Sequence, residues 1–189
     1  MGFHYGQAIE QQFPDLDQDI IIQGLIAGIN NEEDPVYDTP EKANIAVRAY
    51  MKEVSDRKAK ENLEKGEAFL AENAKKDGVK VTDSGLQYEV IEEGNGPKPT
   101  AQDTVIVKYT GTNLDGEIFD SSDLHGGEPS TFTLNRVIRG WSEGILLMSV
   151  GSKYKFYIPA ELAYGAQDRG PKISPNSMLI FDVELVGIK

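Results

Sequence analysis

The sequence predicts an α+β protein, in which an antiparallel sheet wraps over one short helix and follows an all-α N-terminal region and a long connecting helix. Two observations support this prediction. After about residue 78, helical periodicity gives way to short β-type runs that are separated by Gly and Pro. Between Pro40 and Lys76 there is no further proline, and Gly66 is the one glycine, which predicts a single long helix. We therefore expect a helical dimerisation region at 1–38, a connecting helix at 39–77 and a C-terminal domain at 78–189.

The N-terminal region has the pattern of two short helices. Residues 5–13 predict the first helix, which Pro14 ends. Asp17 or Asp19 is a candidate N-cap for the second, whose apolar positions are Ile20, Ile21, Leu25, Ile26 and Ile29. Two helices of this length bury little surface by themselves.

The connecting helix is predicted to begin at Thr39–Pro40, an N-cap followed by proline at the first helical position. Its middle, residues 55–67, keeps only Ala59 and Leu63 as apolar positions. So thin an apolar stripe predicts a solvated rod between two bodies. Gly78 is the expected stop.

The two short helices and the start of the rod together make fewer than about 60 residues, a size that seldom forms a stable core alone. Pairing with a second copy of the chain supplies the missing contacts, so the sequence predicts a homodimer through the N-terminal helices. The alternative is that this region folds back onto the C-terminal domain.

The C-terminal half has the alternation of an antiparallel sheet. Strands are predicted at residues 85–91, 104–110, 152–159 and 178–186, with a hairpin turn at Asp115–Gly116. One face of these strands is expected to carry Val105, Val107 and Tyr109, then Tyr154, Phe156 and Ile158, and finally Leu179, Phe181, Val183 and Leu185. Residues 141–148 predict the short helix.

Bulk properties exclude several classes of function. The net charge of −12 argues against nucleic acid as a partner, because phosphate binding needs a basic surface. The absence of cysteine excludes disulfides and thiolate chemistry. No apolar run approaches the roughly 20 residues of a membrane span, and the first residues have no signal-peptide pattern. The two histidines give no metal spacing, so no cofactor is expected.

One catalytic motif matches only in its letters. Residues 140–144 fit G-x-S-x-G, the nucleophile elbow of α/β-hydrolases. That fold needs a histidine after the serine, whereas His4 and His125 both precede Ser142. A calcium-loop start at residues 15–19 also fails, because Ile20 and Ile26 replace the required Gly and Glu.

A series of short signatures in the C-terminal half is more specific. In order along the chain these are Val107-Lys108-Tyr109-Thr110-Gly111, the run from Asp115 to Ser122, Val137-Ile138-Arg139-Gly140-Trp141, the run from Pro159 to Gly165, and the run from Leu179 to Leu185. From about Gly85 to Lys189 the chain resembles the FKBP family of peptidyl-prolyl cis/trans isomerases. The layout of short helices and a long rod is similar to the macrophage infectivity potentiator subgroup of bacterial FKBPs.

The resemblance implies a half-barrel sheet around one helix, with a proline pocket between them. Implied catalytic positions are Tyr109, Phe119, Asp120, Ile138, Tyr164 and Phe181, and implied substrate-binding positions are Phe132, Val137, Trp141 and Ile173. Trp141 would form the floor. The N–H of Ile138 and the hydroxyl of Tyr164 would hold substrate carbonyls. A rapamycin-type macrocycle is a possible ligand, although Lys172 and Ser174 depart from the family pattern at the rim.

The sequence thus predicts a dimeric prolyl isomerase that binds proline-containing peptides and unfolded clients. Rotation of a peptide bond needs neither a nucleophile nor a proton transfer, so an apolar pocket without His, Cys or metal suits it. A pure client-binding module, in which catalysis is incidental, is the alternative. The subgroup resemblance favours the bacterial periplasm or cell envelope, and the missing signal pattern leaves the cytoplasm open.

Overall fold

The computed structural model describes residues 18–30 and 40–189. The chain divides into two compact units, Met1–Glu53 and Val54–Lys189. In the first unit, α2 (Gln18–Asn30) and the first turns of α3 (Pro40–Asn73) are described, and both helices were predicted. The predicted helix at residues 5–13 and the caps at Asp17 and Thr39 lie outside the described residues.

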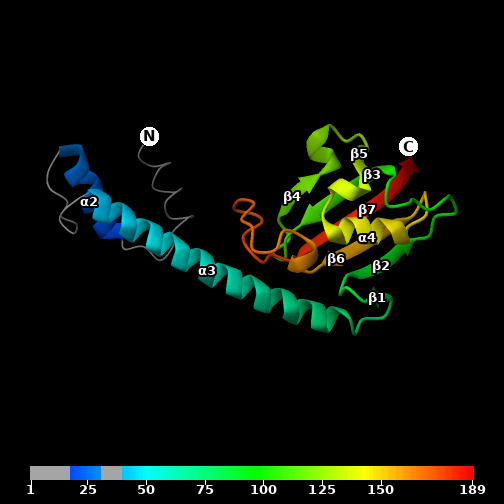
Figure 1. The fold of residues 1–189 in the computed structure, drawn as a ribbon, viewed down its shortest axis with the longest axis horizontal. Helices are drawn as coiled ribbons and strands as arrows, with labels where there is room; N and C mark the ends of the chain where they lie inside the picture. Colours follow the sequence, from blue (N-terminus) through cyan, green and yellow to red (C-terminus); the bar gives the residue numbers. More distant parts are fainter. Residues whose placement is uncertain (1–17, 31–39) are drawn as a thin grey trace. The chain divides into compact units, whose positions relative to one another are not determined.

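The second unit is built on a seven-stranded sheet in which every pairing is antiparallel. Its strands are β1 (Val79–Val81), β2 (Gln87–Glu92), β3 (Thr104–Thr112), β4 (Ile118–Ser121), β5 (Ser130–Thr133), β6 (Lys153–Ile158) and β7 (Leu179–Ile188). The order across the sheet is β1-β2-β6-β7-β3-β4, and β5 pairs with β3 beside β4. The helix α4 (Arg139–Leu147) lies against the sheet (Figure 1). Three 3₁₀ turns complete the unit: η1 (Ser122–His125), η2 (Leu134–Arg136) and η3 (Ala160–Leu162).

The predicted alternation is confirmed on the face of the sheet that meets α4. Val105, Val107 and Tyr109 of β3 are buried, as are the alternate residues of β6 and β7. Burying one face of each strand fixes its register, because a slip of one residue would turn every apolar side chain outward. The expected α+β fold, a half-barrel sheet around one short helix, is therefore what the chain forms.

Two glycines bring α4 unusually close to β6. A Cβ on Gly140 would lie 2.4 Å from the Ile158 side chain, and a Cβ on Gly144 would lie 2.6 Å from the ring of Phe156. Residues four apart share one face of a helix, so this glycine face rests directly on the strand. The close approach turns Trp141 and Ile145 into the core, where both are buried.

The last turns of α3 cover part of the opposite face of the sheet, and contacts also reach into residues 55–67, the stretch that was predicted to be a solvated rod. The ring of Phe69 lies 5.7 Å from that of Tyr157, measured between centroids. The amide of Asn73 donates to Gln87 Oε1 at 3.0 Å, and Gln87 donates to the carbonyl of Leu70 at 2.8 Å. Gln87 and Tyr157 are partners across β2 and β6. A helix-facing patch of the sheet is thereby buried.

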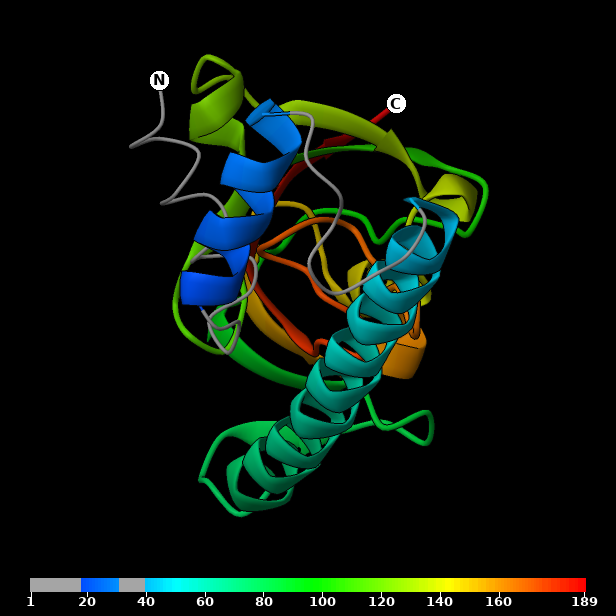
Figure 2. The same ribbon diagram turned by 90° about the vertical axis from the view of Figure 1, so that its left-hand side faces the viewer.

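The same side of α3 is anchored one to two turns earlier. Asn62 Nδ2 donates to the carbonyl of Pro175 at 2.8 Å, and Gly66 is buried against Met178. The contact is made by polar and small side chains, which is why an apolar stripe was absent from the sequence. The helix ends at Asn73, and the chain then turns into the first strands of the sheet (Figure 2). Gly78 takes a left-handed φ of 90° just before β1.

We expect Gly144→Ala to destabilise the second unit by about 1–3 kcal/mol, because the added methyl overpacks against Phe156. The matched control is Gly66→Ala, which replaces a helical glycine whose Cβ would only touch Met178 at 3.4 Å. This control should be neutral or stabilise by up to about 1 kcal/mol. Urea unfolding followed by the fluorescence of Trp141, the only tryptophan, measures both. Equal stability of the two variants would contradict the close-packing argument.

Candidate active site

Trp141 is the centre of an aromatic cluster. It lies in the first turn of α4 and is 4% exposed. Its ring centroid is 5.2 Å from Tyr109 on β3, 5.3 Å from Phe132 on β5 and 5.2 Å from Phe181 on β7. The interplanar angles are 74–88°, so the three ring pairs pack edge-to-face. The quadrupoles of aromatic rings favour this arrangement. Three strands and a helix thus converge on one indole ring.

A fifth ring extends the cluster toward the sheet edge. Phe119 on β4 lies edge-on to Phe181 at 5.4 Å. Both rings rest over Gly111 of β3, where a Cβ would lie 2.6 Å from Phe119 and 2.7 Å from Phe181. Only glycine allows the two rings to come this close to the strand. The resemblance included Gly111 in a signature, but its role depends on a contact that the sequence cannot reveal.

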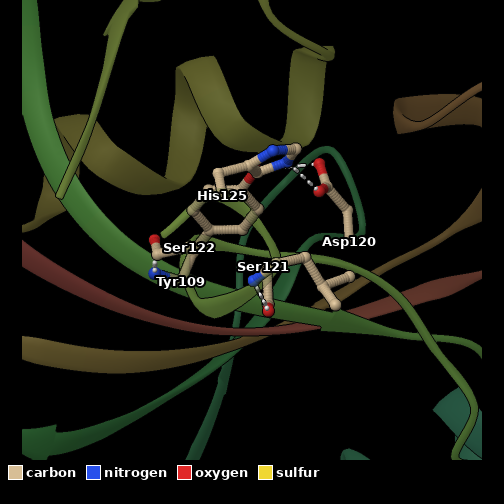
Figure 3. Close-up of polar contacts among 6 residues, drawn as sticks. Tyr109, Asp120, Ser121, Ser122 and His125 are labelled. Carbon is tan, nitrogen blue, oxygen red and sulfur yellow. Dashed lines mark hydrogen bonds and ion pairs between the residues drawn. The ribbon is translucent and has the colours of Figure 1, made fainter. Parts of the chain in front are cut away.

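Asp120, next to Phe119, is held by two donors. The hydroxyl of Tyr109 donates to Asp120 Oδ2 at 2.8 Å, and His125 Nε2 lies 2.8 Å from Asp120 Oδ1 (Figure 3). Burial raises the pKa of Tyr109 far above its usual value, and the hydrogen bond to Asp120 raises it further. The phenol therefore keeps its proton and remains a donor to the carboxylate at neutral pH.

The turn after Asp120 is fixed by two serines. Ser122 Oγ accepts from the N–H of Tyr109 at 3.0 Å, and Ser121 Oγ accepts from the N–H of Leu124 at 3.3 Å. Ser121 is the N-cap of η1, since a serine side chain satisfies a free N–H at a helix start. This turn carries His125 back to Asp120 (Figure 3).

The remaining predicted residues belong to the same hydrophobic core as the rings. Ile173 is buried in that core, and Val137, Ile138 and Tyr164 are partly buried against it. The guanidinium of Arg169 lies 4.9 Å over the ring of Tyr164. Nine of the ten side chains predicted from the sequence lie in or against this one core, and Asp120 is linked to it through Tyr109.

Two donors in this group are unused. Within the described part of the chain, the N–H of Ile138 and the hydroxyl of Tyr164 form no hydrogen bond. Ile138 begins α4, and its carbonyl accepts from the N–H groups of Trp141 and Ser142. The site thus offers two neutral donors at the border of an apolar surface.

Sequence reasoning did not predict His125 and Arg169, which contact the predicted residues Asp120 and Tyr164. His125 lies in a segment, residues 123–128, that has no firm counterpart in the family pattern. The ammonium group of Lys172, which was expected at the rim, donates a hydrogen bond to the carbonyl of Ile118 at 2.6 Å. Its charge therefore lies beside the residue that precedes Phe119.

The hydrolase motif has a structural role instead of a catalytic one. Ser142 Oγ donates to the carbonyl of Leu134 at 2.6 Å, and the flanking Gly140 and Gly144 pack on β6.

Among the described residues, no group of three His, Cys, Asp or Glu side chains is placed to hold a metal ion. No helix in residues 18–30 or 40–189 is both long and apolar enough to cross a bilayer.

Two family models match this chain. Residues 96–186 match "FKBP-type peptidyl-prolyl cis-trans isomerase", and residues 1–90 match "Domain amino terminal to FKBP-type peptidyl-prolyl isomerase". The first covers most of the sheet, α4 and the aromatic cluster. The second covers α2, α3 and the first two strands almost completely.

Individual proteins give the same result. The chain is 45% identical to the FKBP-type peptidyl-prolyl cis-trans isomerase FkpA of Aeromonas hydrophila, over 100% of this chain and 72% of that protein. It is 39% identical to the outer membrane protein MIP of Legionella longbeachae, over 100% of this chain and 83% of that protein. The crystal structure of FkpA from Escherichia coli superposes with a TM-score of 0.79 at 37% identity, covering 100% of this chain and 91% of that one. The chain therefore belongs to the FKBP-type peptidyl-prolyl cis-trans isomerases, in the branch that carries a helical N-terminal domain.

Proposed function

We propose that this isomerase rotates X–Pro bonds on the aromatic surface above Trp141. The observation that carries the proposal is the joint placement of edge-on rings, two unused neutral donors and one anchored carboxylate. A proline ring is apolar and compact, so it suits a floor of aromatic side chains. The adjoining carbonyls need donors, which Ile138 and Tyr164 supply.

The chemistry requires no acid, base or metal. Twisting a peptide bond costs about 18–20 kcal/mol, because the twisted form loses resonance. An apolar site destabilises the planar amide, which is the more charge-separated form. Donors that meet the carbonyl better in the twisted geometry lower the barrier further, and each tenfold in rate needs about 1.4 kcal/mol.

The proposal gives each residue a role. Trp141 forms the floor, and Tyr109, Phe119 and Phe181 form the walls. The N–H of Ile138 and the hydroxyl of Tyr164 hold substrate carbonyls, and Asp120 faces the reacting amide. Phe132, Val137 and Ile173 complete the apolar border. The same surface is where a rapamycin-type macrocycle would bind, with Lys172 altering its rim.

We further propose that the chain acts as a homodimer that assists protein folding. Supporting this, the side chains at i, i+3, i+4 and i+7 of α2, namely Ile22, Leu25, Ile26 and Ile29, are all more than half exposed. One continuous apolar helix face of this kind needs a partner surface. A second copy would supply it, and two active sites on one dimer would bind a client with avidity.

The relatives' names support an envelope location in a bacterium, since one is called an outer membrane protein.

A pure client-binding module remains the second candidate. The exposed apolar face of α2 favours it, because that face can capture unfolded chains without any catalysis.

Isomerisation of a short X–Pro peptide tests the first proposal. We expect Asp120→Ala and Phe181→Leu each to lower kcat/KM by about tenfold or more. Leucine is used because Phe181 is buried and alanine would open a destabilising cavity. Asp123→Ala, an exposed carboxylate three residues on, is the control and should leave kcat/KM unchanged. A folded wild-type protein that does not accelerate isomerisation would support the binding module.

His125 provides a sharper test of how Asp120 is positioned. We expect His125→Ala to lower kcat/KM about twofold to tenfold, because one of the two groups holding the carboxylate is lost. Leu124→Ala removes an exposed neighbour in the same turn and should have no effect. Activity that is equal in the two variants would mean that Tyr109 alone positions Asp120.

The dimer is tested on α2. We expect Leu25→Asp with Ile29→Asp to give monomers in sedimentation velocity, because two charges cannot be buried in an apolar interface. Gln23→Asp, an exposed polar position of the same helix, should leave the dimer intact. Activity on a short peptide should persist, whereas half-maximal protection of an unfolded client should need about tenfold more protein. A dimer that survives the double substitution would contradict the proposed interface.

A further inference from the structure

A concave surface lies outside the aromatic cluster. It is a groove of about 380 Å³ between the last turns of α3, the strand β1 and the turn η3. Its lining includes none of the ten residues predicted for the active site. All of its residues belong to the unit Val54–Lys189.

The groove has an aliphatic bed that remains open to solvent. Leu63, Leu70, Val81 and Met178 contribute apolar side chains. Val81 is 52% exposed and Leu63 is 37% exposed. Small-molecule sites enclose most of their ligand, so walls this open suit a longer chain that lies along the groove.

The neutral polar side chains of the lining are already in use. Asn62 donates to Ser174 Oγ and to the carbonyl of Pro175, and Asn176 donates to the carbonyl of Ala59. Gln87 is bonded to both Leu70 and Asn73. No amide is therefore free to select a small ligand by directed hydrogen bonds.

What remains unpaired is negative charge. Glu67 of α3 and Glu161 of η3 line the groove and are exposed. Neither carboxylate has an ion-pair partner within residues 18–30 and 40–189, and the lining contains no Lys or Arg. The lysines after α3 are engaged elsewhere, Lys75 with Glu72 and Lys76 over the ring of Phe69.

We propose that this groove binds an extended, unfolded polypeptide segment in which an aliphatic residue stands next to Lys or Arg. The aliphatic side chain rests on the bed, and the cation pairs with Glu67 or Glu161. This inference rests on the proposed client-binding function and adds a site for clients that needs no proline. Pro159 and Ala160 line the groove, and Tyr164 of the active site follows in the same segment.

The probe is a short fluorescent peptide, unstructured and free of proline, that carries Leu next to Lys. Its control is the same peptide with Glu in place of Lys. Fluorescence anisotropy with the full-length protein should show tighter binding of the Lys peptide, and this preference should fade as salt screens the charges.

The variant pair separates the groove from general acidity. Glu67→Gln with Glu161→Gln should raise the Kd of the Lys peptide about fivefold to tenfold, since each exposed ion pair contributes modestly. The matched control is Glu61→Gln with Asp77→Asn, which removes the same charge from exposed positions outside the groove and should leave Kd unchanged. Val81→Thr keeps the strand preference but removes apolar surface, and it should weaken both peptides equally.

Several outcomes would overturn the proposal. These are equal affinity for the Lys and Glu peptides, equal loss in the two double variants, or loss in Phe181→Leu but not in the groove variants. A change in sedimentation of Glu67→Gln with Glu161→Gln would assign the groove to a second copy. Isomerisation of the X–Pro peptide is measured in every variant. Failure of the wild type there would overturn the proposed isomerase reaction, whereas intact activity with unchanged Kd would overturn the groove alone.

Discussion

The close approach of α4 to β6 is the constraint on which the rest of the second unit depends. Gly140 and Gly144 remove the two side chains that would hold the helix away from Ile158 and Phe156. Trp141 lies between these glycines in sequence and turns inward as the helix seats. Its ring then meets Tyr109, Phe132 and Phe181 edge-on. The packing that forms the core therefore also forms the floor of the proposed active site, so the proposal makes stability and catalysis depend on the same contacts.

The polar part of the site is built by a different device. Asp120 follows Phe119 on an edge strand, and two serines shape the turn that returns His125 to it. A partly exposed carboxylate needs such support, because water would otherwise compete for its lone pairs. Tyr109 serves both parts, since its ring packs against Trp141 while its buried hydroxyl binds Asp120. The Tyr109 side chain thereby links the ring of Trp141 to the carboxylate of Asp120 and fixes their relative positions.

The sequence predicted the long, strongly patterned elements and the aromatic residues that pack around Trp141. The strands β2, β3, β6 and β7 alternate clearly, and the sequence of α3 begins with a proline and contains no other. β1, β4 and β5 were missed, because runs of three or four residues carry too little periodicity. The anchoring of α3 was missed for another reason. Asn62, Gly66 and Asn73 are polar or small, and their partners are more than 12 residues away. Gly111 and His125 were likewise invisible as site residues, because their roles exist only in three dimensions.

The anchored part of α3 also changes how the two units must be separated in experiments. The boundary falls between Glu53 and Val54, inside an unbroken helix. Cutting the chain near residue 76 would remove Phe69 from Tyr157 and Asn73 from Gln87, which leaves a buried amide without its partners. A loss of activity after such a cut would report damage to the sheet as much as loss of the N-terminal helices. Point substitutions on the exposed face of α2 avoid this ambiguity, because Leu25 and Ile29 belong to the first unit and their side chains are more than half exposed. The shared helix therefore makes side-chain substitution, rather than truncation, the informative way to separate folding assistance from peptide isomerisation.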